Sequence, residues 1–160
     1  MAIPLTGDET GEALARLAQA NQAFAQAYPG ERADRQPVHT VYGGAHLFTA
    51  GVARKLGEVA LASLAEYAPD PASFAGAVGL PQALAPSVYA RVIEKLRREP
   101  VEDHRLDFED GYGNRPDAEE DGHAVSAAGE VAGGMKQGGL PPFMGIRIKP
   151  LTEELRARSL

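Results

Sequence analysis

The chain has 160 residues, of which 44% are hydrophobic and 24% are charged, and these values are those of an ordinary globular protein rather than a disordered one. Its 16 Lys and Arg residues against 22 Asp and Glu give a net charge of −6 without a basic stripe, so no nucleic-acid partner is expected. The absence of cysteine excludes disulfides, thiolate zinc sites and cysteine nucleophiles. No apolar run is as long as a membrane span, and residues 1–8 lack the pattern of a signal peptide; a cytoplasmic protein without a membrane partner is therefore expected.

Residues 1–36 are predicted to be a helical extension of the main domain. The segment 10–28 is rich in Ala, Leu, Gln and Glu, and its apolar residues recur at helical spacing until Pro29-Gly30 ends the pattern. The whole chain, residues 1–160, is expected to form a single partial domain, with the first three strands and their helices in residues 37–160.

The first strand of that domain is predicted over residues 38–42, a short β-branched run that Gly43-Gly44 should end. A helix is then expected over residues 49–65, because apolar residues return at helical spacing, and Thr49 is a suitable N-cap.

Residues 66–100 are predicted to be a helical excursion, too long for a simple link between neighbouring strands. Asp70-Pro71 is typical of a helix start, and Gly79 should close this short helix. A second helix is predicted over residues 86–98.

The last third of the chain is predicted to contain a helix over residues 116–132, a third strand over 143–148 and a helix over 152–158. The expected buried side of the first of these helices is Ala124, Val125, Ala128 and Val131.

The most informative segment is the acidic run from His104 to Gly113. If it begins as a strand, alternation places Leu106 and Phe108 on an apolar face and Arg105, Asp107 and Glu109 on a charged face. In α/β proteins, catalytic groups collect where strands give way to loops, and carboxylates there can bind a cation or hold a proton. The alternative is a solvated edge strand whose charges have no chemical role.

Arg147 is the second candidate. It lies between Ile146 and Ile148, so if those two side chains point toward the helices, Arg147 points inward together with Gly145 and Lys149. An inward Arg could grip a carboxylate, or it could pair structurally with Glu109 on the neighbouring strand, and both roles can hold together.

Several segments resemble one known superfamily. They are Pro37–Tyr42, Glu99–Asp103, Phe108–Tyr112, Asn114–Asp121 and Pro141–Lys149. Phe108-Glu109-Asp110-Gly111-Tyr112 is similar to the Leu-Glu-Asp-Ala-Val segment of the citrate lyase β-subunit and hydroxy-acid aldolase superfamily. The wider set resembles an uncharacterised bacterial branch of it, whose members are often labelled aldolase, citrate-lyase-like or phosphoenolpyruvate kinase. Gly43-Gly44 departs from the Val-Pro usual in that branch.

The resemblance implies a phosphoenolpyruvate/pyruvate-type TIM (β/α)8 barrel with parallel strands and a magnesium-dependent carbon–carbon lyase or aldolase that works through an enolate. The substrate would be a small carboxylate, a 2-oxo acid or an acyl-CoA. Arg147, Glu109 and Asp110 would be catalytic residues. Arg147, Gly111 and His39 would contact substrate, with His39 facing the site from the first strand. Neither direct ligand of Mg²⁺ has a counterpart in this chain, so Glu109 and Asp110 would contact the metal through water at best.

A complete barrel needs about 250 residues and eight strands, whereas three strands are predicted here. The chain is therefore expected to be the N-terminal part of such a barrel, about three βα units with extra helices, and to be inactive alone. Three explanations stay open: a truncated gene or a gene-model error, a split-barrel subunit that needs a partner chain, or a non-catalytic carboxylate-binding module. The chain is also expected either to form a homo-oligomer or to lack the C-terminal portion of the barrel.

Other motifs favour structural roles. The glycine-rich run 133–139 follows a helix and lacks the order of a phosphate loop, which predicts a flexible connector. His46, His104 and His123 have no metal-ligand spacing and are expected to be structural or solvated. The acidic residues of 117–121 suit the first turn of a helix.

Overall fold

The computed structural model describes residues 7–160. The chain divides into two units, residues up to Gln36 and Pro37–Leu160. The first unit contains helix α1 (Gly7–Ala27), close to the predicted segment. Its aromatic rings at Phe24 and Tyr28 lie 4.8 Å apart between centroids, one helical turn from each other. Among residues 7–160, no helix combines the length and apolarity needed to cross a membrane.

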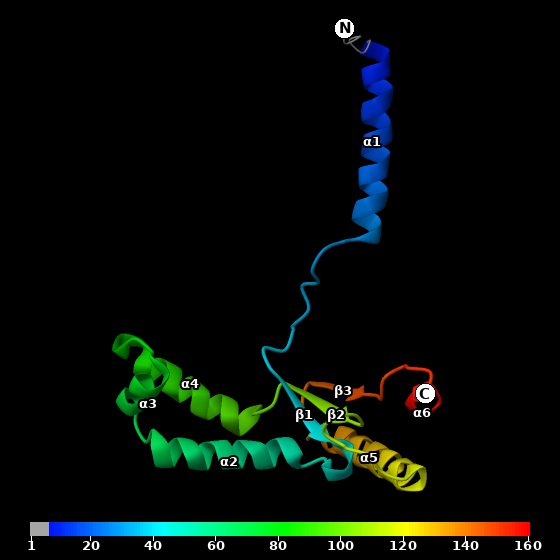
Figure 1. Ribbon diagram of the computed structural model, residues 1–160. Coiled ribbons are helices and arrows are strands. Elements are labelled where there is room, and N and C mark those ends of the chain that lie inside the picture. The colour runs from blue at the N-terminus through cyan, green and yellow to red at the C-terminus, as the bar shows by residue number, and fades with distance from the viewer. Residues whose placement is uncertain (1–6) are drawn as a thin grey trace. The chain divides into compact units, whose positions relative to one another are not determined.

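The second unit is built on a parallel three-stranded sheet, so the mixed α/β class and the parallel strands are confirmed. The strands are β1 (Thr40–Gly44), β2 (Asp103–Asp107) and β3 (Phe143–Arg147), in the order β1-β2-β3. Chain segments with helices separate them, as parallel pairing requires (Figure 1).

Two strand boundaries differ from the predicted ones. Gly43 and Gly44 do not end β1 but pair with Leu106 and Asp107 of β2, because backbone pairing to a central strand outweighs the weak strand preference of glycine. The acidic strand ends at Asp107, so Glu109 lies in the loop that follows it.

Helices α2 (Val52–Tyr67), α3 (Pro71–Val78) and α4 (Ala85–Arg98) follow β1, with α4 packed against both α2 and α3 (Figure 1). The predicted start of α3 is confirmed: Asp70 accepts hydrogen bonds from the backbone of Ala72 and Ser73 in a capping box. Thr49 is not the cap of α2. The N-cap is Gly51, without a side-chain hydrogen bond.

Two short 3₁₀ helices, η1 (Ala45–Leu47) and η2 (Gln82–Leu84), precede α2 and α4 respectively. At the other end of the chain, helix α6 (Arg156–Ser159) covers only the last part of the predicted segment 152–158. The residues before it form turns.

Helix α5 (Asp117–Gln137) continues through most of the glycine-rich run, so the expectation of a flexible connector at 133–139 is wrong. Gly134 is buried where α5 meets the segment before β3, and a Cβ there would lie 2.5 Å from Leu140. That close approach offsets the cost of glycine in a helix, about 1 kcal/mol relative to alanine. The helix ends at Gly138, which has a left-handed conformation.

The buried side of α5 also differs from the predicted one. Ala127 and Gly134 are buried and Val131 is half-buried, whereas Val125 is exposed. The helix is rich in Ala and Gly, so its sequence has little apolar contrast between its sides, and the predicted side is right at Val131 but wrong at Val125.

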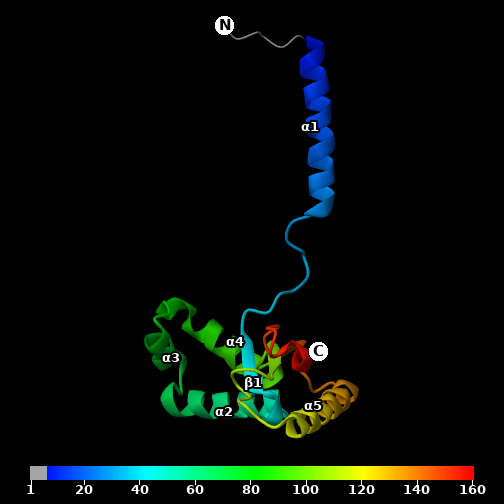
Figure 2. The ribbon, with the colours of Figure 1, turned by 45° about the vertical axis from the view of Figure 1, so that its right-hand side comes forward.

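The core lies between the sheet and α5, which lies beside the strands in Figure 1; Figure 2 shows the same part of the chain turned by 45°. The buried apolar cluster consists of Ala45, Phe48, Leu106, Tyr112 and Ala127. The sheet therefore buries one face against helix α5 and turns its other face, which carries the charged residues, away from this core.

His104 lies in this core on β2, packed against the ring of Phe48 at 5.4 Å between centroids. Neither of its ring nitrogens has a hydrogen-bond partner among residues 7–160. Burial lowers the pKa of His104, although the charge of Asp103 acts in the opposite direction. The ring is therefore neutral in the folded protein at neutral pH.

We expect the free energy of unfolding to decrease as the pH falls below 6.5, the ordinary His pKa. Because the pKa is lower in the folded state, the unfolded chain binds the proton first; the loss reaches at most about 1.4 kcal/mol per pH unit for one proton. Urea unfolding at pH 7.5 and 5.5 would measure it. In His104→Leu the loss should shrink; an equal loss in that variant would contradict this role of His104.

Strand β3 forms an edge of the sheet, and within residues 7–160 no strand pairs with its outer side. A largely apolar groove of about 440 Å³ separates it from α5, with lining residues that include Phe108, Val131, Met135, Met144 and Ile146. The Ile146 side chain is 63% exposed. An unpaired edge with an apolar flank favours association with another chain.

The isolated chain is therefore expected to form dimers or larger species at micromolar concentrations, measurable by sedimentation velocity. Ile146→Lys should shift the population toward monomer, because a charge on an edge strand opposes pairing. The control is Val59→Lys, which places the same charge at an exposed position of α2 and should leave the population of dimers unchanged. A monodisperse monomer that unfolds cooperatively would contradict the prediction.

Candidate functional site

The face of the sheet opposite the core is mostly polar. Alternation along the strands places on it Thr40, Tyr42, Gly44, Asp103, Arg105, Asp107, Phe143, Gly145 and Arg147. Asp107 and Arg147 are register partners at the C-terminal ends of β2 and β3, where the loop 108–113 also begins. In open α/β sheets this is the edge at which ligands bind.

Arg147 lies among three carboxylates at this edge. Its guanidinium forms ion pairs with Glu109, with Asp110 at 2.8 Å and with Asp107 at 3.5 Å. The predicted ion pair between Glu109 and Arg147 is present, but Glu109 reaches Arg147 from the loop after β2 and not from a strand position. The group carries a net negative charge, so an incoming carboxylate must displace an existing partner of Arg147.

The partners differ in burial. Asp110 is 77% exposed and Glu109 26% exposed, whereas the Asp107 side chain is only 3% exposed. Exposed ion pairs contribute little because water competes for both charges. Glu109 and Asp110 are therefore the partners that a ligand can replace, and Asp107 is a fixed one.

Asp107 also shapes the loop. One of its oxygens accepts a hydrogen bond from the backbone of Glu109 at 2.7 Å, and the other accepts one from Gly111 at 3.1 Å. These two bonds turn the chain back over the end of β2 and bring Glu109 and Asp110 to Arg147. The backbone amide of Gly111 therefore lies at the site, bonded to Asp107.

The hydrogen bond to Asp110 raises the pKa of Arg147, with Glu109 and Asp107 adding to the effect and desolvation opposing it. The guanidinium also lies over the ring of Tyr42, 5.7 Å from its centroid. A charge that is permanent and held between an aromatic ring and carboxylates suits recognition of an anionic group.

The loop 108–113 is anchored on its other side by Tyr112. This buried side chain shares a hydrogen bond of 2.7 Å with His123 of α5, and the guanidinium of Arg115 lies 4.9 Å from its ring centroid. Burial raises the pKa of the Tyr112 phenol, which therefore stays protonated at neutral pH. His123 is accordingly a structural residue in this fold, as expected.

Lys149 does not point inward with Arg147, contrary to the sequence-based expectation. It contacts the buried Glu120 of α5 at 3.5 Å and the backbone oxygen of Phe108 at 3.3 Å. Because β3 ends at Arg147, strand alternation no longer applies at position 149.

His39 is not brought to Arg147 either. It precedes β1, and its Nε2 accepts a hydrogen bond of 3.4 Å from the backbone of Glu102, just before β2. That contact lies at the N-terminal ends of the strands, the opposite end from Arg147.

Two residues at the site, Asp107 and Tyr42, were not singled out as site residues from the sequence. Alternation does assign Asp107 to the charged face, but its backbone contacts depend on the strand ending there. Tyr42 reaches Arg147 across β2, and only the strand order brings the two together.

The described carboxylates do not form a magnesium site by themselves. Asp107 uses both oxygens on backbone amides, and Glu109 and Asp110 pair with Arg147. Within residues 7–160, no group of three or more His, Asp or Glu side chains has an arrangement that could hold a metal ion.

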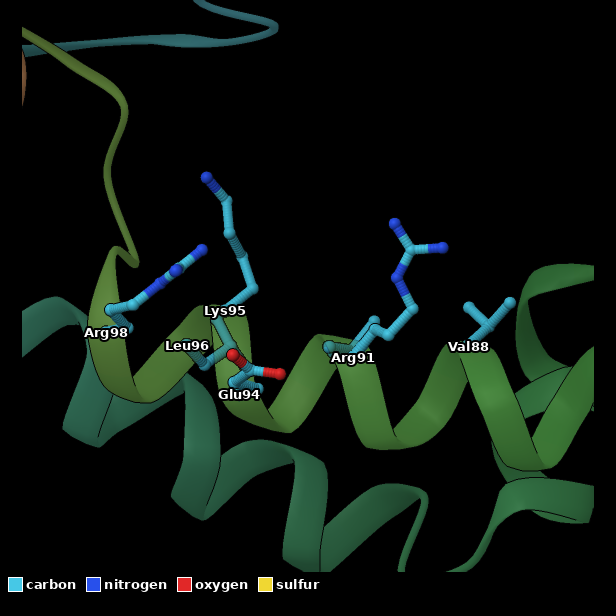
Figure 3. Close-up of a pocket in the computed structure, with 7 residues that line it drawn as sticks. Val88, Arg91, Glu94, Lys95, Leu96 and Arg98 are labelled. Atoms are coloured by element: carbon cyan, nitrogen blue, oxygen red, sulfur yellow. The ribbon is translucent and has the colours of Figure 1, made fainter.

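A hollow of about 400 Å³ on α4 is a weaker candidate. Figure 3 shows Arg91, Lys95 and Arg98 projecting from this helix on one side. Lys95 is already paired, at 2.5 Å each, with Glu99 and Glu102, and these pairs raise its pKa although burial opposes them. The charged side chains of this hollow therefore do not point toward a common position at which a ligand could bind.

The comparisons with known proteins give one match. The family model described as a domain of unknown function (DUF6986) matches residues 17–160. The chain belongs to this family. A search of curated proteins and a search of solved structures found no match. The matched residues include both the polar sheet face and the loop 108–113, and the description of the family assigns no function to them.

Proposed function

We propose that this chain forms the first three βα units of a (β/α)8-barrel enzyme of the citrate lyase and aldolase type, and that Arg147 binds the carboxylate of its substrate. The observation that carries the proposal is the position of Arg147 at the C-terminal ends of parallel strands, on the polar face of the sheet. In barrels of this kind, active sites are built at that end.

The chemistry of the group supports carboxylate recognition. A guanidinium presents two parallel N–H donors that match the two oxygens of a carboxylate. Asp107 and the Tyr42 ring hold Arg147 from the protein side, while its exposed partner Asp110 can be replaced. In a carbon–carbon lyase, such a residue binds the carboxylate beside the carbon at which enolate charge develops.

A magnesium ion would need ligands from outside residues 7–160, because the described carboxylates already pair with Arg147 or with backbone amides. An ion would stabilise the enolate oxygen as a Lewis acid. The role of residues 7–160 in the reaction is to bind and orient the carboxylate of the substrate through Arg147. Accordingly, the isolated chain is expected to bind such a ligand weakly and to show no turnover.

The test is a titration of the chain with pyruvate, followed through the backbone amide signals of residues 109–111 and 145–147 in NMR spectra. We expect shifts at millimolar pyruvate, because the ligand must displace Glu109 and Asp110. The methyl ester of pyruvate lacks the charge and should leave these signals in place. Equal responses to both ligands, or no response to pyruvate, would overturn the proposal.

A second candidate is a subunit whose sheet is completed by another polypeptide. The unpaired edge of β3 and the apolar groove beside it favour this possibility. Native mass spectrometry of the protein purified from its own cells would decide between the two. A complex with a second, different chain would support the split arrangement, and a homo-oligomer or a monomer would oppose it.

A further inference from the structure

A second arginine lies on the same face of the sheet as Arg147. Arg105 of β2 is the register partner of Gly145, and Gly145 precedes Arg147 by two residues on β3. With strands about 4.8 Å apart and a rise of about 3.3 Å per residue, the Cα atoms of the two arginines lie about 8 Å apart. This spacing suits a short ligand with an anionic group at each end.

Arg105 is held in a fixed orientation by a buried acid. Its Nε and Nη2 donate to one oxygen of Asp103 at 3.0 and 2.8 Å, and the same oxygen accepts a hydrogen bond from Thr40 at 2.9 Å. Asp103 is 1% exposed. Because Asp103 engages one edge of the guanidinium, Nη1 is left without a hydrogen-bond partner among residues 7–160.

The missing side chain of Gly145 provides the space that Nη1 occupies. A Cβ built at this position would overlap Nη1 and would lie 2.9 Å from Cζ of Arg105. Since position 145 faces the same way as Arg147, the Arg105 guanidinium lies over Gly145 of β3, on the same face as Arg147. At 37% exposure, the Arg105 side chain can be reached by a ligand.

We infer that Arg105 is a specificity-determining residue that binds a second carboxylate, so that the preferred ligand is a short dicarboxylate. The inference rests on the proposed function, because Arg147 must bind the first carboxylate. Arg105 is partly neutralised by Asp103, yet its Nη1 can still donate charge-assisted hydrogen bonds. Orientation by a buried acid lowers the entropy lost when the second carboxylate binds.

The test compares the dissociation constants of 2-oxoglutarate and pyruvate for the whole chain by NMR titration. Wild type is expected to bind 2-oxoglutarate at least about tenfold more tightly than pyruvate. Arg105→Gln should reduce this ratio to within about twofold while leaving pyruvate affinity unchanged. Arg54→Gln, the same change at an exposed position of α2, is the control and should retain the ratio.

Gly145→Ala provides an independent variant, because it displaces the Arg105 guanidinium and keeps its charge. It should also lose the preference for 2-oxoglutarate, with thermal melting used to check that each variant is folded. An unchanged ratio in Arg105→Gln, or an equal weakening of both acids, would overturn the inference and leave the proposed function intact. Failure of both acids to bind wild type would overturn both.

Discussion

Replacing Asp107 by alanine is expected to lower the free energy of unfolding by about 3 kcal/mol. The Asp107 carboxylate is buried and charged, and it accepts two backbone hydrogen bonds that the variant would lose. The amides of Glu109 and Gly111 would lose their acceptor. Arg147 would also lose its one deeply buried partner. Urea unfolding followed by circular dichroism would measure the change.

Asp110→Ala is the matched control, since it removes another carboxylate partner of the same arginine. The side chain of Asp110 is exposed, and within residues 7–160 it makes no hydrogen bond to the loop backbone, so its removal should leave stability nearly unchanged. A similar loss in both variants would mean that charge balance around Arg147, and not the support of the loop by Asp107, determines stability at this edge.

Replacing Arg147 by lysine is expected to weaken pyruvate binding at least about tenfold, although the positive charge is kept. An ammonium is a point charge and cannot present the two parallel donors of a guanidinium. Its contact with the Tyr42 ring would also change, because the planar guanidinium lies over that ring. The dissociation constant is measured by the same NMR titration as for wild type.

The control for this variant is Arg115→Lys. Arg115 also contacts a carboxylate, that of Glu119, and an aromatic ring, that of Tyr112, but it lies by the start of α5. It should retain pyruvate affinity. If Arg147→Lys binds pyruvate as tightly as wild type, the charge alone suffices and the bidentate geometry has no role in recognition.

The sequence was sufficient to predict elements whose signals are local. The helix start at Asp70-Pro71, the helix end at Gly79 and the three strands follow from residue types within a few positions. The ion pair between Glu109 and Arg147 was also predicted, but it forms for a different reason: Glu109 lies in the loop after β2, and Asp107 turns that loop toward Arg147.

Features that depend on packing were not predictable in the same way. The path of α5 through its glycines depends on the close approach of Leu140 to Gly134, and Lys149 turns to Glu120 because β3 ends before it. The space above Gly145 that Arg105 fills depends on the register between β2 and β3. Each of these is set by contacts between segments far apart in the chain.

A crystal structure of the chain with pyruvate tests the central claim most directly. We expect the carboxylate of pyruvate within hydrogen-bond distance of the Arg147 guanidinium. Asp110 should be displaced, and the hydrogen bonds from the loop backbone to Asp107 should be retained. Pyruvate bound elsewhere, or Arg147 pointing toward the helices, would contradict it.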